Sequence, residues 1–150
     1  MTPRAVSSLV PQQGAMCLLE EVLSFDEKSI VCSASSHRSA ANPLRCDGRL
    51  PASAGIEYGA QAVAAHGALR AAGAVPRIQA GLLAGVRAVH LHAKFLDDEP
   101  ELLTVRAERL IEESGRLLYA FAVEGAGREL VSGRVAIVLS SPAPGPGAAR

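Results

Sequence analysis

Net charge is the first thing that this sequence lacks. Its 15 lysine and arginine residues are balanced by 15 aspartate and glutamate residues. Proteins that bind nucleic acids or anionic membrane surfaces usually carry a clustered excess of basic residues. The balance argues against nucleic acid and membrane as partners. We expect the protein to bind neutral molecules, or to recognise its partners locally.

Long hydrophobic runs are missing as well. The polar residues that interrupt the first part of the chain are Ser7, Ser8, Gln12 and Gln13. No secretory signal is therefore visible, and we expect a cytoplasmic protein. The polar residues within the most apolar helical stretch, residues 54–74, are Glu57, Gln61, His66 and Arg70. A lipid-spanning helix would not carry so many polar groups, so we expect a core helix and no membrane segment.

Patterns typical of disulfides, metal sites and nucleotide loops are also absent. The three cysteines, Cys17, Cys32 and Cys46, are odd in number and are not spaced like zinc ligands. We expect small buried residues, with a reactive thiol at Cys46 as the alternative. His90 and His92 share one face of a predicted strand, but no third ligand matches them, so we expect exposed side chains and no metal. We expect no cofactor, since no glycine-rich phosphate loop is present.

Length and composition indicate a single domain. A chain of 150 residues that is 49% hydrophobic can bury one core but is too short for two ordinary domains. We assign residues 1–140 to this domain. Residues 141–150 are rich in proline and glycine and have little side chain to bury, so we expect a flexible tail.

Short β-prone runs lie at both ends of the domain. Residues 16–22 and 30–35 predict a hairpin, and residues 37–51 predict a long irregular loop. Four further runs, joined by short turn-like segments, cover residues 88–95, 102–111, 117–123 and 130–139. They predict a four-stranded antiparallel meander.

One long helix lies between these two groups of strands. It is predicted to begin near Ala52, with Ser53 as its N-cap, and to end at Gly73 before Pro76. The residues that share one face, at about 100° per residue, are Glu57, Gln61, Ala64 and Ala68. The order of elements predicts an α+β fold in which one antiparallel sheet wraps around a central helix.

Glu57 is the first candidate for a functional residue. It is a single carboxylate in the otherwise small and apolar segment Gly55-Ile56-Glu57-Tyr58-Gly59-Ala60-Gln61-Ala62. Burying an ionised carboxylate without a partner is costly, so Glu57 should face a polar group or a cavity that admits substrate. His66 lies nearly opposite on the helix, and we expect it on a solvated face or at a helix contact.

Three segments carry a resemblance to a known family. They are Leu9-Val10-Pro11 before the first strand, Asn42-Pro43 in the loop, and Pro51-Ala52-Ser53-Ala54-Gly55-Ile56-Glu57 at the start of the helix. Together with the order of elements, they resemble the hotdog-fold 3-hydroxyacyl-acyl-carrier-protein dehydratases over residues 9–139. The likeness is closest to a divergent branch of predicted dehydratases, some of which are associated with aryl polyene synthesis.

The resemblance implies a dimeric enzyme that acts on acyl thioesters. It implies a hotdog homodimer whose sheets join edge to edge, with acyl tunnels at the interface and substrates carried by acyl carrier protein or coenzyme A. It also implies a catalytic histidine and a catalytic acid. Glu57 matches the acid, and Gln61 matches a glutamine that follows it by four residues.

The two histidines that the resemblance implies have no counterpart here. The main family has a Gly-His-Phe-Pro segment just before the helix, where this chain has Gly48-Arg49-Leu50-Pro51. The divergent branch commonly has a second histidine after the N-terminal proline, but here Gln12 and Gln13 follow Pro11. His37 is the histidine nearest to the predicted site.

Dehydration needs a base, an acid and a backbone amide that polarises the thioester carbonyl. Glu57 can fill one proton-transfer role, and an amide between Ala52 and Gly55 can serve the carbonyl. His37 could swing toward Glu57 and fill the other role, although solvated loop histidines are more common. Arg49 cannot act as a base, because its pKa stays above about 12. It is a candidate to bind substrate or to hold Glu57 ionised.

Two alternatives to dehydration remain. In the first, Glu57 activates water for thioester hydrolysis, as some hotdog thioesterases are thought to do. In the second, the chain is a non-catalytic hotdog subunit, either a scaffold or a contributor of Glu57 to a composite site whose histidine belongs to another chain. The partner would then be a different hotdog protein in place of a second copy.

Overall fold

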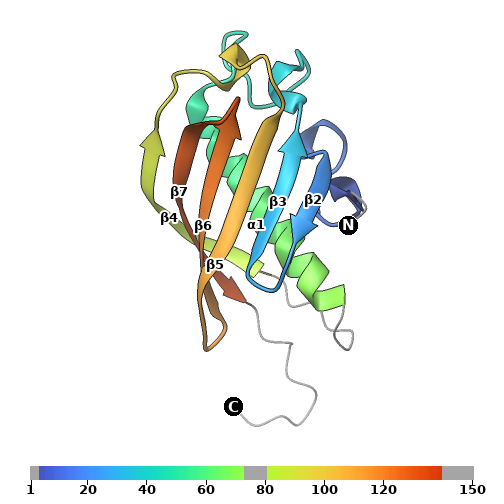
Figure 1. Cartoon of the computed structure of the whole chain (residues 1–150), viewed down its shortest axis with the longest axis vertical. Coiled ribbons are helices and arrows are strands. Elements are labelled where there is room, and N and C mark those ends of the chain that lie inside the picture. Colours follow the sequence, from blue (N-terminus) through green and yellow to red (C-terminus); the bar gives the residue numbers. More distant parts are fainter. Residues whose placement is uncertain (1–3, 73–80, 140–150) are drawn as a thin grey trace.

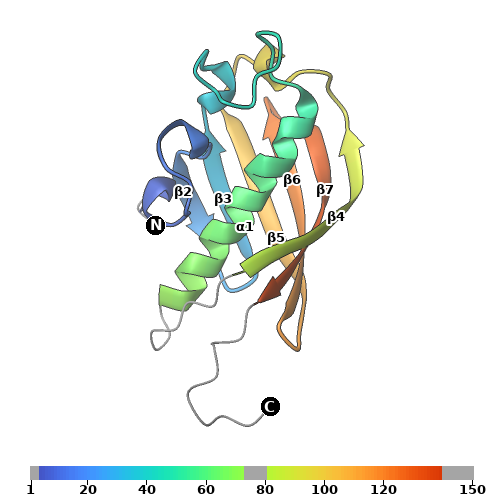
Figure 2. The same cartoon turned by 180° about the vertical axis from the view of Figure 1, so that it is seen from behind.

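A curved sheet around one long helix forms the body of the protein. The computed structural model describes residues 4–72 and 81–139. Helix α1 (Gly55–Ala72) lies behind the sheet in Figure 1 and in front of it in Figure 2. The predicted helix end at Gly73 and the predicted tail lie outside the described residues. Within the described residues, no helix has the length and apolar character that crossing a membrane requires.

Seven antiparallel strands make up the sheet, in the order β1-β2-β3-β5-β6-β7-β4. The strands are β1 (Arg4–Ala5), β2 (Glu21–Phe25), β3 (Ser29–Ala34), β4 (Gly81–Leu91), β5 (Leu103–Glu113), β6 (Arg116–Gly125) and β7 (Arg128–Leu139). The short 3-10 helices are η1 (Val6–Ser8), η2 (Gly14–Met16), η3 (Ser36–Arg38), η4 (Ala52–Ala54) and η5 (Leu96–Asp98). The predicted α+β fold with one central helix is confirmed.

The first hairpin is confirmed, but its first strand begins later than predicted. β2 starts at Glu21; of the predicted run, Met16 ends η2 and residues 17–20 are irregular. The Gln61 side chain accepts a hydrogen bond from the Leu18 N–H and donates one to the Met16 carbonyl. These backbone groups therefore bond to a side chain of the helix and not to a neighbouring strand.

The predicted four-stranded meander is wrong for one strand. β5, β6 and β7 are consecutive neighbours, as predicted, but β4 pairs with β7 and β5 pairs with β3. The connection from β4 to β5 spans residues 92–102 and includes η5, so it is long enough to cross the end of the sheet. β4 begins at Gly81 and ends at Leu91, so both of its ends lie earlier than in the predicted run of residues 88–95. It is bulged between Arg87 and His90, where Ala88 has a φ of 55°. The expected alternation of side chains therefore breaks there.

The helix begins differently from the prediction. η4 precedes α1, the cap residue of η4 is Pro51, and no side chain caps it. Ser53 lies inside η4 and is not the N-cap. The entry is set by the main chain, because Pro51 is extended and its carbonyl accepts a hydrogen bond from the Ala54 N–H at 3.0 Å.

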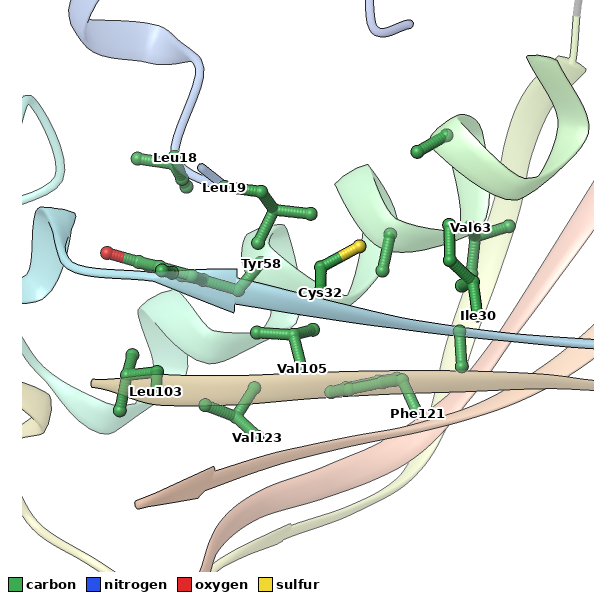
Figure 3. Close-up of a cluster of buried hydrophobic side chains, with 14 of the residues drawn as sticks. Leu18, Leu19, Ile30, Cys32, Tyr58, Val63, Leu103, Val105, Phe121 and Val123 are labelled. Carbon is green, nitrogen blue, oxygen red and sulfur yellow. The ribbon is translucent and has the colours of Figure 1, made fainter. Parts of the chain in front are cut away.

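Two glycines let α1 lie close against the sheet. A Cβ atom at Gly55 would lie 2.8 Å from Cγ2 of Val131 on β7, and one at Gly59 would lie 2.5 Å from Cγ of Phe121 on β6. Figure 3 shows Phe121 among the buried side chains that fill the space between the sheet and the helix. Tyr58, on the first turns of α1, belongs to this core and is fully buried. The first turns of α1, which carry Glu57, are therefore held rigidly against the sheet.

Candidate functional site

Glu57 lies in the first turn of α1 and is half-buried. Its Oε2 atom accepts two long hydrogen bonds, from Nε2 of Gln61 at 3.3 Å and from Nε2 of Gln12 at 3.4 Å. Its Oε1 atom has no hydrogen-bond partner among the described residues. This Oε1 atom is not fully buried. One carboxylate oxygen is thus held by two amides, and the other is open to an incoming group.

Gln61 fixes the segment that covers this carboxylate. Its side chain is buried, its Oε1 accepts from the Leu18 N–H at 2.8 Å, and its Nε2 donates to the Met16 carbonyl at 2.7 Å. Figure 2 shows the N-terminal segment beside α1 and β2. The amide of Gln61 therefore joins the helix, the N-terminal segment and the carboxylate of Glu57.

Gln12 is a site residue that the sequence analysis did not assign. The segment between η1 and η2 brings it to Glu57 across 45 positions of sequence. The available signal was its position directly after Pro11, where the resemblance implies a histidine. The side chain next to Glu57 is therefore an amide, that of Gln12, which cannot transfer protons as an imidazole does.

His37 is not the solvated loop residue that its position suggested. It lies in η3 and is fully buried. Its Nε2 atom is 3.0 Å from the carbonyl oxygens of both Glu99 and Glu101. Because carbonyls only accept, Nε2 carries the proton, and Nδ1 is left buried without a partner. Burial lowers the pKa of His37. No hydrogen bond joins it to Glu57 in the described chain.

His66 is also buried, so the first of its two expected settings, a solvated face, is wrong, and the residue lies instead where the helix contacts β6 and the turn after β2. Its Nε2 atom lies 2.8 Å from the Asp26 carbonyl, and its Nδ1 atom lies 2.6 Å from the Tyr119 hydroxyl. The carbonyl requires a proton on Nε2, so the hydroxyl of Tyr119 donates to Nδ1. Burial lowers the pKa of His66 and raises that of Tyr119.

His90 and His92 are exposed on and just after β4, as predicted. Their rings stack with centroids 6.1 Å apart, and His92 lies 2.9 Å from a carboxylate oxygen of Glu129. The sequence contains four histidines, and the structure describes all of them. Each makes its contacts away from Glu57, so the described chain does not itself pair this acid with an imidazole.

Arg49 does not hold Glu57. Its guanidinium donates to Oδ2 of Asp97 at 2.9 Å and to Asp98, and it stacks on the Phe95 ring at 3.9 Å from the centroid. These hydrogen bonds raise the pKa of Arg49. The side chain joins the loop before the helix to η5. The expected ion pair with Glu57 is therefore replaced by ion pairs within this end of the molecule.

The N–H groups at the start of the helix are mostly used. The Ala52 N–H donates to the Lys94 carbonyl at 3.0 Å, and the Gly55 N–H donates to carbonyls of η4. The Ser53 N–H has no acceptor among the described residues. Of the backbone amides expected to serve a substrate carbonyl, that of Ser53 is the available one, and neither Ala52 nor Gly55 offers a free N–H.

The cysteines differ from one another. Cys32 is fully buried in the core, as predicted, and burial raises its pKa to about 12. Cys17 is half-buried and Cys46 is exposed, so the expectation of burial is wrong for Cys46. Cys46 pairs through its backbone with Arg49, in a turn where Asp47 has a φ of 52°. The turn geometry exposes this thiol.

A pocket of about 390 Å³ lies near the end of β4 and does not include Glu57. It is lined by His92, Ala93, Lys94, Phe95, Asp98, Glu99, Arg128, Glu129 and Leu130. Several of its polar side chains contact one another: Nε2 of His92 lies 2.9 Å from Glu129, and the guanidinium of Arg128 lies 3.7 Å from Glu99. The pocket therefore does not belong to the carboxylate site.

A central helix wrapped by one antiparallel sheet, with a carboxylate on its first turn, defines a hotdog protein. Over residues 4–143, the chain matches the model of the ApeP-like family, described as ApeP dehydratase. The chain therefore belongs to the ApeP-like dehydratase family, which confirms the predicted resemblance. A comparison with curated protein sequences gave no match.

Solved structures share this fold. A chain in the dehydratase heterocomplex ApeI:P from Xenorhabdus doucetiae is similar, with a TM-score of 0.79 and 23% identity over 94% of this chain and 93% of that one. AziG of S. sahachiroi gives a TM-score of 0.58 and 17% identity over 83% of this chain and 92% of that one. A hypothetical thioesterase with coenzyme A from Streptococcus pneumoniae TIGR4 gives a TM-score of 0.59 and 11% identity over 81% of this chain and 85% of that one.

Proposed function

We propose that this chain is one subunit of a two-chain hotdog dehydratase that acts on 3-hydroxyacyl thioesters, of the kind used in aryl polyene synthesis. The family supports the reaction class. The similar chain in the ApeI:P heterocomplex supports a second, different hotdog subunit. One observation carries the composite site: Glu57 has an open carboxylate oxygen, while all four histidines of the chain are engaged elsewhere.

The reaction needs two proton transfers. A base removes a proton from C2 of the acyl chain, and an acid protonates the 3-hydroxyl, which leaves as water when the C3–O bond breaks. The electron pair of the C2–H bond forms the double bond between C2 and C3. In our proposal Oε1 of Glu57 performs one transfer, and an imidazole of the partner subunit performs the other.

The start of the helix supplies the remaining element. The free N–H of Ser53 is placed one turn before Glu57. A backbone donor at a helix start stabilises negative charge that develops on a thioester oxygen. Ala52 and Gly55 then shape this turn, and Arg49 holds the loop next to it through Asp97.

The test compares this chain, an ApeI-type hotdog subunit and the complex of the two. Each is incubated with 3-hydroxyacyl thioesters, and the enoyl product is measured. We expect the complex to form enoyl thioester and this chain alone to form none. In the complex, Glu57→Gln should lower the rate by about 10²–10⁴-fold. Glu108→Gln makes the same chemical change on an exposed strand position and should leave the rate unchanged.

Two results would contradict the proposal. A chain that dehydrates the substrate by itself, at the rate of the complex, has no need of a partner's imidazole. A complex whose rate is the same with Glu57→Gln does not use this carboxylate.

Thioester hydrolysis is the second candidate, and the free oxygen of Glu57 favours it. The two amides on Oε2 leave Oε1 of Glu57 free to orient and activate a water molecule. Hydrolysis would release a free thiol from a saturated acyl thioester, whereas dehydration would not. Thiol release by this chain alone, abolished by Glu57→Gln, would favour the thioesterase.

A further inference from the structure

The orientation of the Gln12 amide is fixed by its neighbour. Nε2 faces Oε2 of Glu57, and an ionised carboxylate only accepts hydrogen bonds. The reverse orientation would place two acceptor oxygens against each other. Gln12 therefore directs its own oxygen, Oε1, to the other side of the amide.

That oxygen has no donor. Oε1 of Gln12 is buried and has no hydrogen-bond partner in the described part of the chain, although the residue as a whole is only half-buried. A buried acceptor without a partner is unfavourable, because it has lost water and gained nothing in exchange. The open oxygen of Glu57 is a second acceptor in the same cluster.

The segment that carries Gln12 is tied to the helix by hydrogen bonds a few residues further along. Gln61 anchors the backbone at Met16 and Leu18, a few residues beyond Gln12, and it also contacts Glu57. Oε1 of Gln12 and Oε1 of Glu57 both lack a partner, and they belong to two side chains that one hydrogen bond joins. A ligand that suits this arrangement must bring a hydrogen-bond donor to it.

We propose that Gln12 is a specificity residue whose Oε1 atom accepts a hydrogen bond from the 3-hydroxyl of the acyl chain. The inference rests on the proposed function, because it places the acyl thioester at this carboxylate. A saturated acyl chain has no donor at C3, and its thioester offers only acceptors. Sites built to bind a hydroxyl reject analogues that lack it, because the site's buried polar groups then remain unpaired.

The test measures binding to the complex with the ApeI-type subunit. The probes are a 3-hydroxyacyl pantetheine amide and the saturated acyl pantetheine amide of the same length, which resist hydrolysis. Isothermal titration calorimetry gives both affinities. We expect the unaltered complex to bind the hydroxylated probe at least tenfold more tightly. We expect Gln12→Leu to reduce that preference to less than twofold, with the saturated probe bound no more weakly than before.

Gln13→Leu is the matched control. Gln13 is the next residue, is exposed, and bonds only to the Pro11 carbonyl at 3.5 Å. It should keep the tenfold preference. Gln12→Met provides a second apolar variant of similar length, and thermal unfolding of each variant shows that it is folded.

The outcomes separate the two proposals. If the folded complex binds neither probe, the proposed function fails. If it binds both probes equally well, or if the folded Gln12 variants keep the preference, the proposed function stands and the role of Gln12 is overturned.

Discussion

Nε2 of Gln61 lies 3.3 Å from Oε2 of Glu57, four residues earlier on the same helix. The same nitrogen also donates to the Met16 carbonyl at 2.7 Å. One turn of helix therefore joins the candidate catalytic acid to the segment that covers it. The alignment of Glu57 and Gln61 follows from the helical repeat. The contact of Gln61 with the Met16 carbonyl follows only from the tertiary fold.

Replacing Gln61 with leucine should weaken the fold as well as the site. The Leu18 N–H and the Met16 carbonyl lose their partner, and each orphaned group costs about 1–3 kcal/mol. We expect Gln61→Leu to lower the free energy of unfolding by about 2–4 kcal/mol, as measured by urea denaturation. Gln13→Leu should change it by less than about 0.5 kcal/mol. Equal stabilities would show that the Gln61 contacts contribute nothing.

Gly59 and Gly67, two of the three glycines of α1, should respond oppositely to alanine. A methyl group at Gly59 would overlap the Phe121 ring, so we expect Gly59→Ala to destabilise the protein by about 1–3 kcal/mol or more. A methyl group at Gly67 meets nothing within 4 Å, so Gly67→Ala should stabilise it by about 0.5–1 kcal/mol. Thermal unfolding of both variants tests the pair. Destabilisation by Gly67→Ala would show that the exposed face is not free.

The Tyr58 hydroxyl should stabilise the loop over the start of the helix. It lies 2.7 Å from Oγ of Ser36 and accepts a hydrogen bond from Nδ2 of Asn42 at 3.1 Å. We expect Tyr58→Phe to cost about 1–3 kcal/mol, because buried polar groups lose a partner. Asn42→Ala should be less costly in the Tyr58→Phe background than in the unaltered protein. Strictly additive effects in this double-mutant cycle would argue against the contact.

Stability should decrease as the pH falls below about 6.5, the ordinary pKa of histidine. Burial lowers the pKa of both His66 and His37, aided at His66 by Arg70 and Arg109. The unfolded chain therefore binds protons before the folded chain does, and acid favours unfolding. Each group contributes up to about 1.4 kcal/mol per pH unit in this range.

Urea unfolding between pH 8 and pH 5 measures this slope. His66→Gln should reduce it, and His90→Gln, on the exposed strand, serves as the control. A slope that is identical in the unaltered protein and in His66→Gln would exclude His66 as a source of the acid sensitivity.

Local patterns predicted most of the elements but not their neighbours. The helix with Glu57 and Gln61 on one face, and the hairpins β2–β3, β5–β6 and β6–β7, follow from periodicity and short turns. The place of β4 beside β7 does not, because strand order depends on where a longer connection crosses the sheet. Pairings between distant parts of the chain leave no local signal.

The same limit applies to the site. Glu57 was singled out as the one carboxylate in a small and apolar helical segment, and Gln61 because the resemblance implies a glutamine four residues later. The contact of Gln12 with Glu57 spans 45 residues, and the burial of His37 depends on carbonyls more than 60 residues away. Arg49 was expected near Glu57, but the acids of η5 bind it instead. Sequence spacing could indicate which residues carry the chemistry, but not which distant groups face them.

The site is assembled from two parts of unequal constraint. Glu57 belongs to a helix that packs against the sheet at its glycines. The Gln12 amide that faces it belongs to the N-terminal segment, which Gln61 holds by hydrogen bonds at Met16 and Leu18. Substitutions in this segment thus change the groups that face the carboxylate without changing the contacts between the helix and the sheet. Such an arrangement offers a physical route by which related proteins could diverge between elimination, hydrolysis and purely structural roles.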